Sequence, residues 1–433
     1  IKEVLTIEKP KYKAAKRYGR WIGKKLKPTL KYYEPVPRGL IFPRGFSNQA
    51  VLLCREVTGN SPEIVDNRRK LEDIQFSFSG NLRPYQENAL EIIADRSFGV
   101  LEAGTGSGKT VMALAAIANR KQPTLVIVHT KELLYQWKER AEQFLGVTTG
   151  LVGDGFSDIQ PLTIAIVNSA RKKTEELVPK FGHLIVDECH RVPASTFTDV
   201  VSRFDCHFLL GLSATAFRND EGMTKVIYYF MGDRIHSVDQ EQLQETGAIV
   251  KPKVIRKITP FTYQYRGDYQ PLLKALTKHE ARNMMIIEDI RNTVEKQSEG
   301  TALVVSDRVS HCSFFERKLK EAKINAELLT GQTPADQRSE IVEKVQEGKI
   351  DVLIATLQLI SEGFDCPGLS TLFLTTPITF EGRLLQVIGR IMRPAENKQA
   401  IVYDYVDSGV SALKRSANIR HQVLSQLSPT EHR

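Results

Sequence analysis

Short apolar runs rich in β-branched residues alternate with amphipathic stretches from about residue 82 onward. This alternation predicts parallel strands joined by crossover helices, and the whole pattern occurs twice. In the first half we expect strands near residues 98–102, 125–129, 162–167, 183–187 and 207–212, and a helix over 131–144. In the second half we expect strands near 301–305, 325–329, 351–355, 371–375 and 399–405, and helices near 309–322, 335–347 and 381–392. The sequence therefore predicts an α/β protein with two tandem parallel-sheet domains.

Residues 1–78 have a different pattern, with scattered prolines and seven aromatic side chains before residue 50. We interpret this segment as a separate small domain that contains β-strands. Residues 249–300 begin with a polar, proline-flanked stretch and continue into a helical one, which is typical of a connector followed by the first helix of a second lobe. The expected domains are thus residues 1–78, 79–248 and 249–433.

Positive charge is concentrated at the beginning of the chain. The net charge is +9, and the first 50 residues contain 13 basic against three acidic side chains. The remaining residues hold 47 basic and 48 acidic side chains, so they are close to neutral. A polyanion such as DNA is the expected partner of the leading segment, although a solubilising tail or a disordered, non-specific DNA-binding arm would also explain the charge. The candidate contacts are Lys11, Lys13, Arg17, Arg20, Lys24 and Lys25.

The five cysteines lie far apart and form no C-x-x-C pair, so neither structural zinc nor a disulfide framework is expected. No apolar run approaches the roughly 18 residues of a membrane span, and the first residues lack the apolar core of a signal peptide. We therefore expect an intracellular, cytoplasmic protein of a bacterium or a phage-infected cell, although the chain begins without methionine.

A glycine-rich loop follows the strand predicted near 98–102. The sequence EAGTGSGKT, residues 102–110, precedes a run of helix formers, which is the strand, loop and helix order of a phosphate-binding P-loop. Its glycines let backbone N–H groups turn towards phosphates, Lys109 reaches the β and γ phosphates, and Thr110 places its hydroxyl on Mg²⁺. ATP and Mg²⁺ are thus the expected cofactors. The residues assigned to the nucleotide are Gly104, Thr105, Gly106, Ser107, Gly108, Lys109 and Thr110.

The stretch VDECHR, residues 186–191, places two carboxylates beside a cysteine and a histidine. At the carboxyl end of a predicted strand, Asp187 can bind the magnesium ion that a P-loop requires, and Glu188 can orient and deprotonate the attacking water. A zinc site would need further Cys or His at ligand spacing, and only the distant His183 and Cys206 are available. A Cys and His nucleophile, or a solvated acidic turn, would also be compatible with this cluster.

The remaining motifs resemble those of superfamily 2 helicases and translocases in order and spacing, from residue 82 to about 394. The tetrad DECH and the lack of a long insertion between the lobes are similar to the XPB and UvsW branch of that superfamily. This resemblance implies two RecA-like domains, hydrolysis of ATP and movement on nucleic acid. The motifs are LRPYQ (82–86), HTKELLYQW (129–137), LSATAFR (212–218), ATLQLISEGFDCP (355–367) and QVIGRIMRP (386–394).

The resemblance also implies roles for individual residues. Further nucleotide contacts come from Arg83, Gln86, Gly363 and Asp365. Catalytic roles fall to Lys109, Asp187, Glu188, Gln386, Arg390 and Arg393, with the two arginines as arginine fingers, while Val387 stands where many relatives have another arginine. Coupling of hydrolysis to movement is assigned to His190, Ser213 and Thr215. Contacts with a nucleic-acid strand are assigned to Thr130, Lys131, Asn168, Ser306 and Thr356.

Three functions are compatible with these residues. The leading segment resembles the duplex-recognition domain of the UvsW type, so we expect a monomeric, ATP-dependent DNA helicase or translocase that remodels forked or branched DNA. An RNA helicase or RNA-sensing ATPase is the second function, because the helicase core does not reveal its substrate sugar. An ATP-switched nucleic-acid-binding scaffold is the third, although the intact Glu188, Arg390 and Arg393 argue against it.

Overall fold

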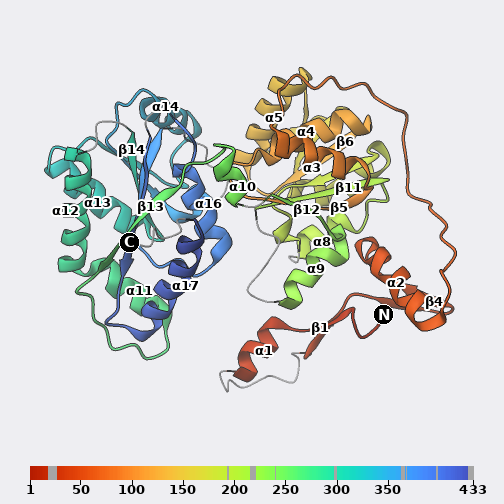
Figure 1. Cartoon of the computed structure of the whole chain (residues 1–433), viewed down its shortest axis with the longest axis horizontal. Coiled ribbons are helices and arrows are strands. Elements are labelled where there is room, and N and C mark those ends of the chain that lie inside the picture. Colours follow the sequence, from red (N-terminus) through yellow and green to blue (C-terminus); the bar gives the residue numbers. More distant parts are fainter. Residues whose placement is uncertain are drawn as a thin grey trace. The chain divides into compact units, whose positions relative to one another are not determined.

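The computed structural model describes all residues except 18–26, 193–194, 215–220, 239, 297–299, 362–365, 367, 396–397 and 428–433. The chain divides into two compact units (Figure 1). The first comprises Ile1–Ala103 and Gly108–Val238, and the second comprises Gly104–Ser107 and Asp239–Arg433. Each unit has one large, mainly parallel sheet flanked by helices, which confirms the predicted α/β fold with two tandem RecA-like domains.

An eight-stranded sheet forms the framework of the first unit, and its strands pair in parallel except for the last two. The five expected strands are all present within one residue of the predicted bounds. In spatial order the strands are β12 (Arg234–Val238), β5 (Phe98–Ala103), β11 (Phe208–Ser213), β10 (His183–Val186), β6 (Thr124–Val128), β9 (Leu162–Ile166), β7 (Gly150–Gly153) and β8 (Phe156–Ser157). The helices are α3 (Pro84–Ala94), α4 (Lys109–Arg120), α5 (Lys131–Leu145), α6 (Val167–Lys172), α7 (Thr174–Leu177), α8 (Ser195–Val201) and α9 (Glu221–Met231).

The second unit has a six-stranded sheet in which every pairing is parallel. The five expected strands lie within two residues of the predicted bounds, whereas the first strand falls in the stretch that we expected to be a connector. In spatial order they are β13 (Pro252–Ile258), β18 (Ala400–Val406), β17 (Leu369–Leu374), β14 (Thr301–Ser306), β16 (Val352–Thr356) and β15 (Ala326–Leu329). The helices are α10 (Gln240–Glu245), α11 (Tyr269–Lys278), α12 (Glu280–Lys296), α13 (Val309–Glu321), α14 (Ala335–Gln346), α15 (Leu357–Ser361), α16 (Glu381–Ile391) and α17 (Ser411–Leu427).

The leading segment contains short strands, as expected, together with helices. Its elements are β1 (Thr6–Glu8), α1 (Pro10–Arg17), β2 (Thr29–Lys31), β3 (Glu34–Val36), β4 (Gly39–Ile41), a 3-10 turn (Arg44–Phe46) and α2 (Ser47–Thr58). Leu5 and Phe46 are buried in the same apolar cluster as Phe230 of α9. Arg44 donates a hydrogen bond to the carbonyl of Cys206 at 2.5 Å. The segment is thus part of the first unit, and a role for residues 1–78 as a domain of its own stays a prediction.

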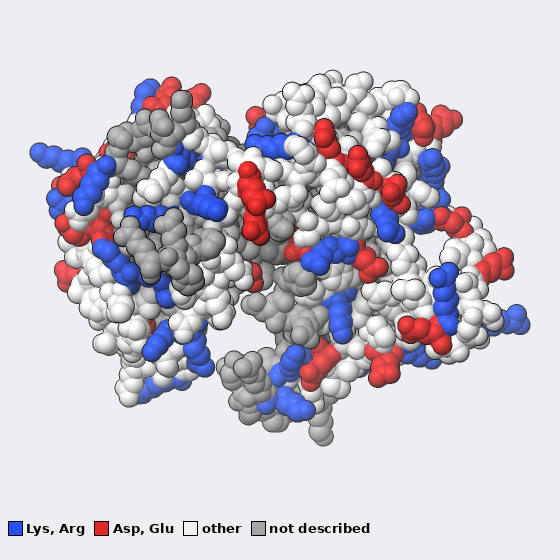
Figure 2. Space-filling view, viewed as in Figure 1, with Lys and Arg blue, Asp and Glu red and all other residues white. Residues whose placement is uncertain are grey.

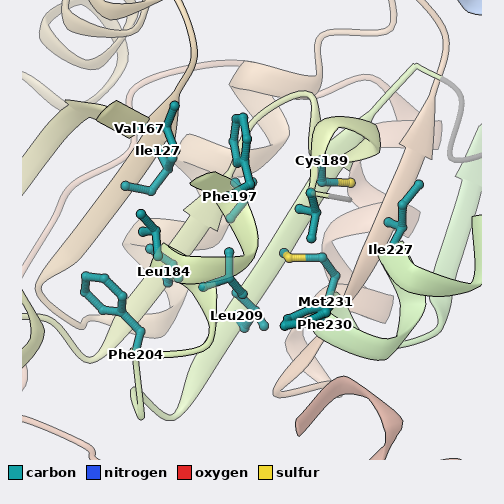
Figure 3. Packing of buried hydrophobic residues seen from close by; sticks show 14 of the residues in the cluster. Ile127, Val167, Leu184, Cys189, Phe197, Phe204, Leu209, Ile227, Phe230 and Met231 are labelled. Atoms are coloured by element: carbon teal, nitrogen blue, oxygen red, sulfur yellow. The ribbon is translucent and has the colours of Figure 1, made fainter. Parts of the chain in front are cut away.

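The core of the first unit fixes the end of strand β10 (Figure 3). Ile127, Leu184 and Leu209 come from three adjacent strands and pack in one cluster. Cys189, just beyond β10, is fully buried in this cluster with Met231. Cys189 therefore packs against apolar side chains, and the two acidic residues before it are held in place by the core.

Candidate active site

Several predicted motifs follow strands that end at one edge of the sheet in the first unit. In a parallel sheet the carboxyl ends of neighbouring strands meet at the same edge. At this edge β5 leads into the loop 104–108, β11 ends at Ser213, β10 is followed by Asp187, and β6 is followed by Thr130. The strand order β5-β11-β10-β6 therefore gathers motifs that lie far apart in the sequence.

The LRPYQ motif packs against the P-loop. Gly108 has φ +78°, and a Cβ atom at this position would lie 2.5 Å from Nε2 of Gln86. Gln86 is buried on α3, and its Oε1 accepts a hydrogen bond from the N–H of Arg83 at 2.9 Å. Lys109 Nζ donates to the carbonyl of Ala103 at 2.8 Å, so the lysine folds back over the loop. A glycine at 108 is required by both the backbone conformation and the close approach of Gln86.

Two carboxylates follow strand β10 and have different surroundings. Asp187 is buried, its Oδ1 accepts from the N–H of Glu188 at 2.9 Å, and its Oδ2 accepts from Nε1 of Trp137 at 2.9 Å. Glu188 has φ +50°, a left-handed conformation that costs a non-glycine residue about 1–3 kcal/mol. Its Oε2 lies 3.1 Å from Nδ1 of His190. The surrounding structure thus holds a strained glutamate beside a buried aspartate.

The same surroundings move the pKa values of the two carboxyl groups apart. Burial raises the pKa of Asp187 to about 6, and the charge of Glu188 adds to this rise. Burial also acts to raise the pKa of Glu188, but the hydrogen bond from His190 and the charge of Lys109 outweigh it, so this pKa is lowered. Glu188 is therefore an anion at neutral pH, whereas a nearby cation would stabilise the ionised form of Asp187.

The donor atoms suit Mg²⁺ better than a softer metal. Asp187 offers a carboxylate and Thr110, in the first turn of α4, offers a hydroxyl, and such hard oxygen ligands together with phosphates are what Mg²⁺ prefers. Within the described part of the chain no group of three or more Cys, His, Asp or Glu side chains could hold a metal. Burial raises the pKa of the Cys189 thiol well above its usual range, which opposes a role as a thiolate ligand or nucleophile.

A buried contact joins the acidic motif to the end of β11. Nδ1 of His190 lies 3.2 Å from Oγ of Ser213, and both residues are buried. The same atom, Nδ1 of His190, thus lies within hydrogen-bond distance of both Glu188 and Ser213. The coupling role of His190 and Ser213 stays a prediction, and Thr215, the third residue assigned to it, lies outside the described residues.

The residues assigned to a nucleic-acid strand differ in exposure. Thr130 accepts from the N–H of Leu133 at 3.3 Å and caps α5, and the exposed Lys131 forms an ion pair with Asp154. Asn168 is exposed and Thr356 half-buried at the end of β16. Ser306 is different, because it is fully buried and its hydroxyl lies 2.9 Å from Nδ1 of His311. The structure does not support a direct strand contact by Ser306.

The assigned residues of the second unit lie on and after α16. Gln386 and Arg390 are half-buried on this helix, and Nε of Arg390 donates to the carbonyl of Ile360 at 3.3 Å. The carbonyl of Arg393 accepts from Nζ of Lys398 at 2.7 Å. Their catalytic roles stay predictions. Gly363 and Asp365 lie outside the described residues, as do Arg20, Lys24 and Lys25, whereas Lys11, Lys13 and Arg17 belong to α1.

Two residues near the site were not recognised in the sequence. The helical spacing of residues 131–144 predicts that Trp137 packs in the core, which is correct, but not that its N–H binds Asp187. The signal was present, because a buried indole N–H needs an acceptor. Asp154, the partner of Lys131, gave no comparable signal, since it stands in a glycine-flanked turn.

A P-loop, a paired acidic motif and a buried contact between His190 and Ser213 on one mainly parallel sheet, followed by a second, parallel sheet, are the features of a two-domain, nucleotide-driven helicase core. Residues 79–218 match the family described as the res subunit of type III restriction enzymes, and residues 284–395 match the helicase conserved C-terminal domain. The chain is similar to superfamily 2 helicases and translocases and resembles their XPB and UvsW branch, which implies the use of ATP.

Individual relatives agree with this assignment. The DNA 3'-5' translocase XPB2 of Sulfurisphaera tokodaii is 27% identical over 379 residues, which cover 78% of this chain and 84% of the relative. The ATP-dependent DNA helicase uvsW of Enterobacteria phage T4 is 24% identical and covers 93% of this chain and 85% of its own. The structure of S. cerevisiae Dbp5 bound to RNA and ADP BeF3 shares the fold, with a TM-score of 0.58, 16% identity and coverage of 80% and 88%.

No helix among the described residues combines the length and apolar character needed to cross a bilayer.

Proposed function

We propose that the protein is an ATP-dependent DNA helicase or translocase that remodels forked or branched DNA. The observation that carries the motor activity is the pair Asp187 and Glu188 at the end of β10, linked through His190 to Ser213. DNA as the substrate is supported by the DNA translocase and DNA helicase among the relatives, and branched DNA by the similarity to uvsW.

The P-loop and the residues after strands β5 and β10 divide the chemistry among themselves. Backbone N–H groups of the P-loop and the ammonium group of Lys109 bind the phosphates, while Asp187 and Thr110 hold Mg²⁺. When bound there, Mg²⁺ would supply positive charge to the phosphate oxygens. Glu188, an anion at neutral pH, orients the water that attacks the γ-phosphorus and accepts its proton as the bond to ADP breaks.

Two further steps follow from the resemblance. Arg390 and Arg393 stabilise the negative charge that develops on the transferred phosphoryl group. The contact of His190 with Ser213 then reports the state of the acidic motif to the stretch 212–218. Gripping of the sugar–phosphate backbone is independent of base sequence, so preference for a junction is assigned to the basic leading segment.

ATPase measurements with forked DNA, linear duplex, single strands and RNA of the same sequence test the proposal. We expect stimulation by DNA, strongest with the fork, and a loss of at least about 100-fold in kcat for Glu188→Gln because the general base is removed. Glu175→Gln, which neutralises an exposed carboxylate on α7, is the matched control and retains activity.

Each outcome has a separate meaning. Equal turnover in Glu188→Gln and the control would refute the catalytic assignment and favour a scaffold. Stronger stimulation by RNA than by DNA would favour an RNA helicase. Equal stimulation by forked and linear DNA would remove the proposed preference for branched substrates while leaving the motor in place.

A further inference from the structure

The carboxylate of Asp187 is fixed by two hydrogen bonds on different oxygen atoms. Oδ1 accepts from the backbone N–H of Glu188 and Oδ2 accepts from Nε1 of Trp137, both at 2.9 Å. A carboxylate oxygen has two lone pairs, so each oxygen is oriented by one donor and keeps a second lone pair for another partner. The plane of the carboxylate is thereby set before any metal ion binds.

Trp137 makes this contact from the buried face of helix α5. Its side chain is 1% exposed and packs with Leu133, Leu134 and Ala141 on the same face of the helix. An indole has one polar atom, a donor, and most buried tryptophans satisfy it with some nearby acceptor. Here the acceptor is the side chain assigned to hold Mg²⁺, which is the arrangement of an outer-shell partner that orients a metal ligand.

The same helix carries residues assigned to the nucleic-acid strand. Thr130 caps its first turn and Lys131 is its first residue, on an exposed face, while Trp137 lies on the buried face within the next two turns. A hydrogen-bonded helix moves as a stiff body over this distance. A displacement of the start of α5 is therefore passed to the indole that holds Asp187.

We propose that Trp137 is a positioning residue of the magnesium site, which fixes the Asp187 carboxylate and ties it to helix α5, so that strand binding at the start of α5 changes the affinity for Mg²⁺. This inference rests on the proposed function for the roles of Asp187 and Lys131.

The first test compares Trp137→Phe with Tyr229→Phe. The first variant keeps a large aromatic ring and removes the donor to Asp187. The second also removes one hydroxyl donor from a buried aromatic side chain, whose bond goes to the carbonyl of Val4 at 2.5 Å, away from the site. We expect the Mg²⁺ concentration for half-maximal ATPase to rise about tenfold in Trp137→Phe, with KM for ATP at saturating Mg²⁺ unchanged, and neither value to move in Tyr229→Phe.

A second test leaves Trp137 in place and uses it as a reporter. The chain has two tryptophans, so Trp21→Phe makes Trp137 the sole source of indole emission. In the presence of a non-hydrolysable ATP analogue and without DNA, titration with Mg²⁺ should shift the emission in a saturable way. The shift should be absent when Asp187→Asn is added. Single-stranded DNA should change the Mg²⁺ concentration at the midpoint of the emission titration in this protein. It should also change the Mg²⁺ concentration for half-maximal ATPase in the wild type, and that change should be lost in Trp137→Phe.

The results separate the inference from the function on which it rests. If the Mg²⁺ requirement of Trp137→Phe is unchanged, or if Trp137 emission does not change with Mg²⁺, then Trp137 has only a packing role in the core, even if ATPase is normal. Absence of any nucleic-acid-stimulated ATPase would refute the proposed function, while a saturable emission shift would still support the positioning role. If Trp137→Phe does not fold, the emission titration alone decides.

Discussion

Lys131 has an internal partner at the site where a phosphate is expected to bind. Its ammonium group pairs with Asp154, whose other carboxylate oxygen accepts from the hydroxyl of Tyr135 at 2.8 Å. Hydrogen bonds from Lys131 and Tyr135 lower the pKa of Asp154, so the carboxylate is an anion at neutral pH. If Lys131 contacts nucleic acid, as predicted, Asp154 competes with the nucleic acid for this cation.

We accordingly expect Asp154→Asn to tighten the binding of nucleic acid. The gain is at most about fivefold, because an exposed ion pair is worth up to about 1 kcal/mol. Asp158→Asn removes the same charge from an exposed neighbour that does not contact Lys131, and is the control. Fluorescence anisotropy with labelled single strands measures the affinity of both variants for nucleic acid. Equal affinities in the two variants would mean that Asp154 does not compete.

His311 makes the stability of the second unit depend on pH. Burial, with a smaller contribution from the charge of Arg282, lowers the pKa of His311 to about 3. Its Nδ1 lies 2.9 Å from Oγ of Ser306 and its Nε2 lies 3.1 Å from Oδ1 of Asn283, contacts that suit a neutral ring. Below about pH 6.5 the unfolded chain binds a proton that the folded chain excludes, so stability is complete above this pH and falls towards about pH 3.

At pH 5 this exclusion should cost roughly 2 kcal/mol of unfolding free energy relative to pH 7.5. Denaturant unfolding at the two pH values should therefore show a smaller loss for His311→Gln than for the wild type. His421→Gln, at an exposed position on α17, should behave like the wild type. A loss in His311→Gln as large as in the control would contradict the assignment.

At the scale of elements, substitutions at two glycines with positive φ distinguish the effect of backbone strain from the effect of steric contact. Gly108 and Gly146 both have positive φ, +78° and +62°, but a Cβ at 146 would meet nothing within 4 Å whereas one at 108 would meet Gln86. We expect Gly146→Ala to cost about 1 kcal/mol of stability and to leave ATPase unchanged.

Gly108→Ala should add a displaced Gln86 and a distorted P-loop to the same strain, so KM for ATP should rise by about tenfold or more. Thermal unfolding and ATPase kinetics of the two variants provide the comparison. If both variants keep the wild-type KM, the packing of the LRPYQ motif against the P-loop has no functional role.

Several strands could be predicted because both of their faces are covered. The strands β5, β6, β9, β10 and β11 have both faces covered, so they appear as continuous apolar runs and were predicted within one residue. Strand β13 lies at an edge, and all its residues after Pro252 are half-buried or exposed, so Lys253, Arg256 and Lys257 made it resemble a connector. The edge strand β12 was missed for the same reason.

The candidate site divides in a similar way. Local patterns were sufficient to place the P-loop and Asp187 and Glu188 at strand ends, because each motif is continuous in the sequence, while their roles stay predictions. The bond from Trp137 to Asp187 and the burial of Ser306 depend on packing between distant segments. No periodicity in one sequence records such contacts.

At the scale of the whole molecule, the leading segment must be tested without removing it. Leu5 and Phe46 belong to the core of the first unit, so truncation would expose Phe230 and destabilise the ATPase unit itself. Figure 2 shows basic and acidic side chains interspersed over the described surface on this face, so the excess positive charge has to be sought in the leading segment.

A double charge reversal, Lys13→Glu with Lys16→Glu, addresses exposed residues of α1 and leaves the core intact. We expect weaker binding of forked DNA and a decrease of about 2 in the slope of log affinity against log salt concentration. Lys274→Glu with Lys278→Glu reverses two exposed lysines on α11 and is the control. Identical salt slopes in both proteins would exclude α1 from DNA binding.

The joint between the leading segment and α9 also has a mechanical meaning. A Cβ at Gly45 would lie 2.4 Å from the N atom of Gly232 and 2.6 Å from the carbonyl oxygen of Tyr228, so the two backbones touch without clearance. Because the two backbone segments are closely packed, a displacement of one is passed directly to the other. If the leading segment binds DNA, as predicted, tension on that DNA would displace α9, which follows the stretch 212–218.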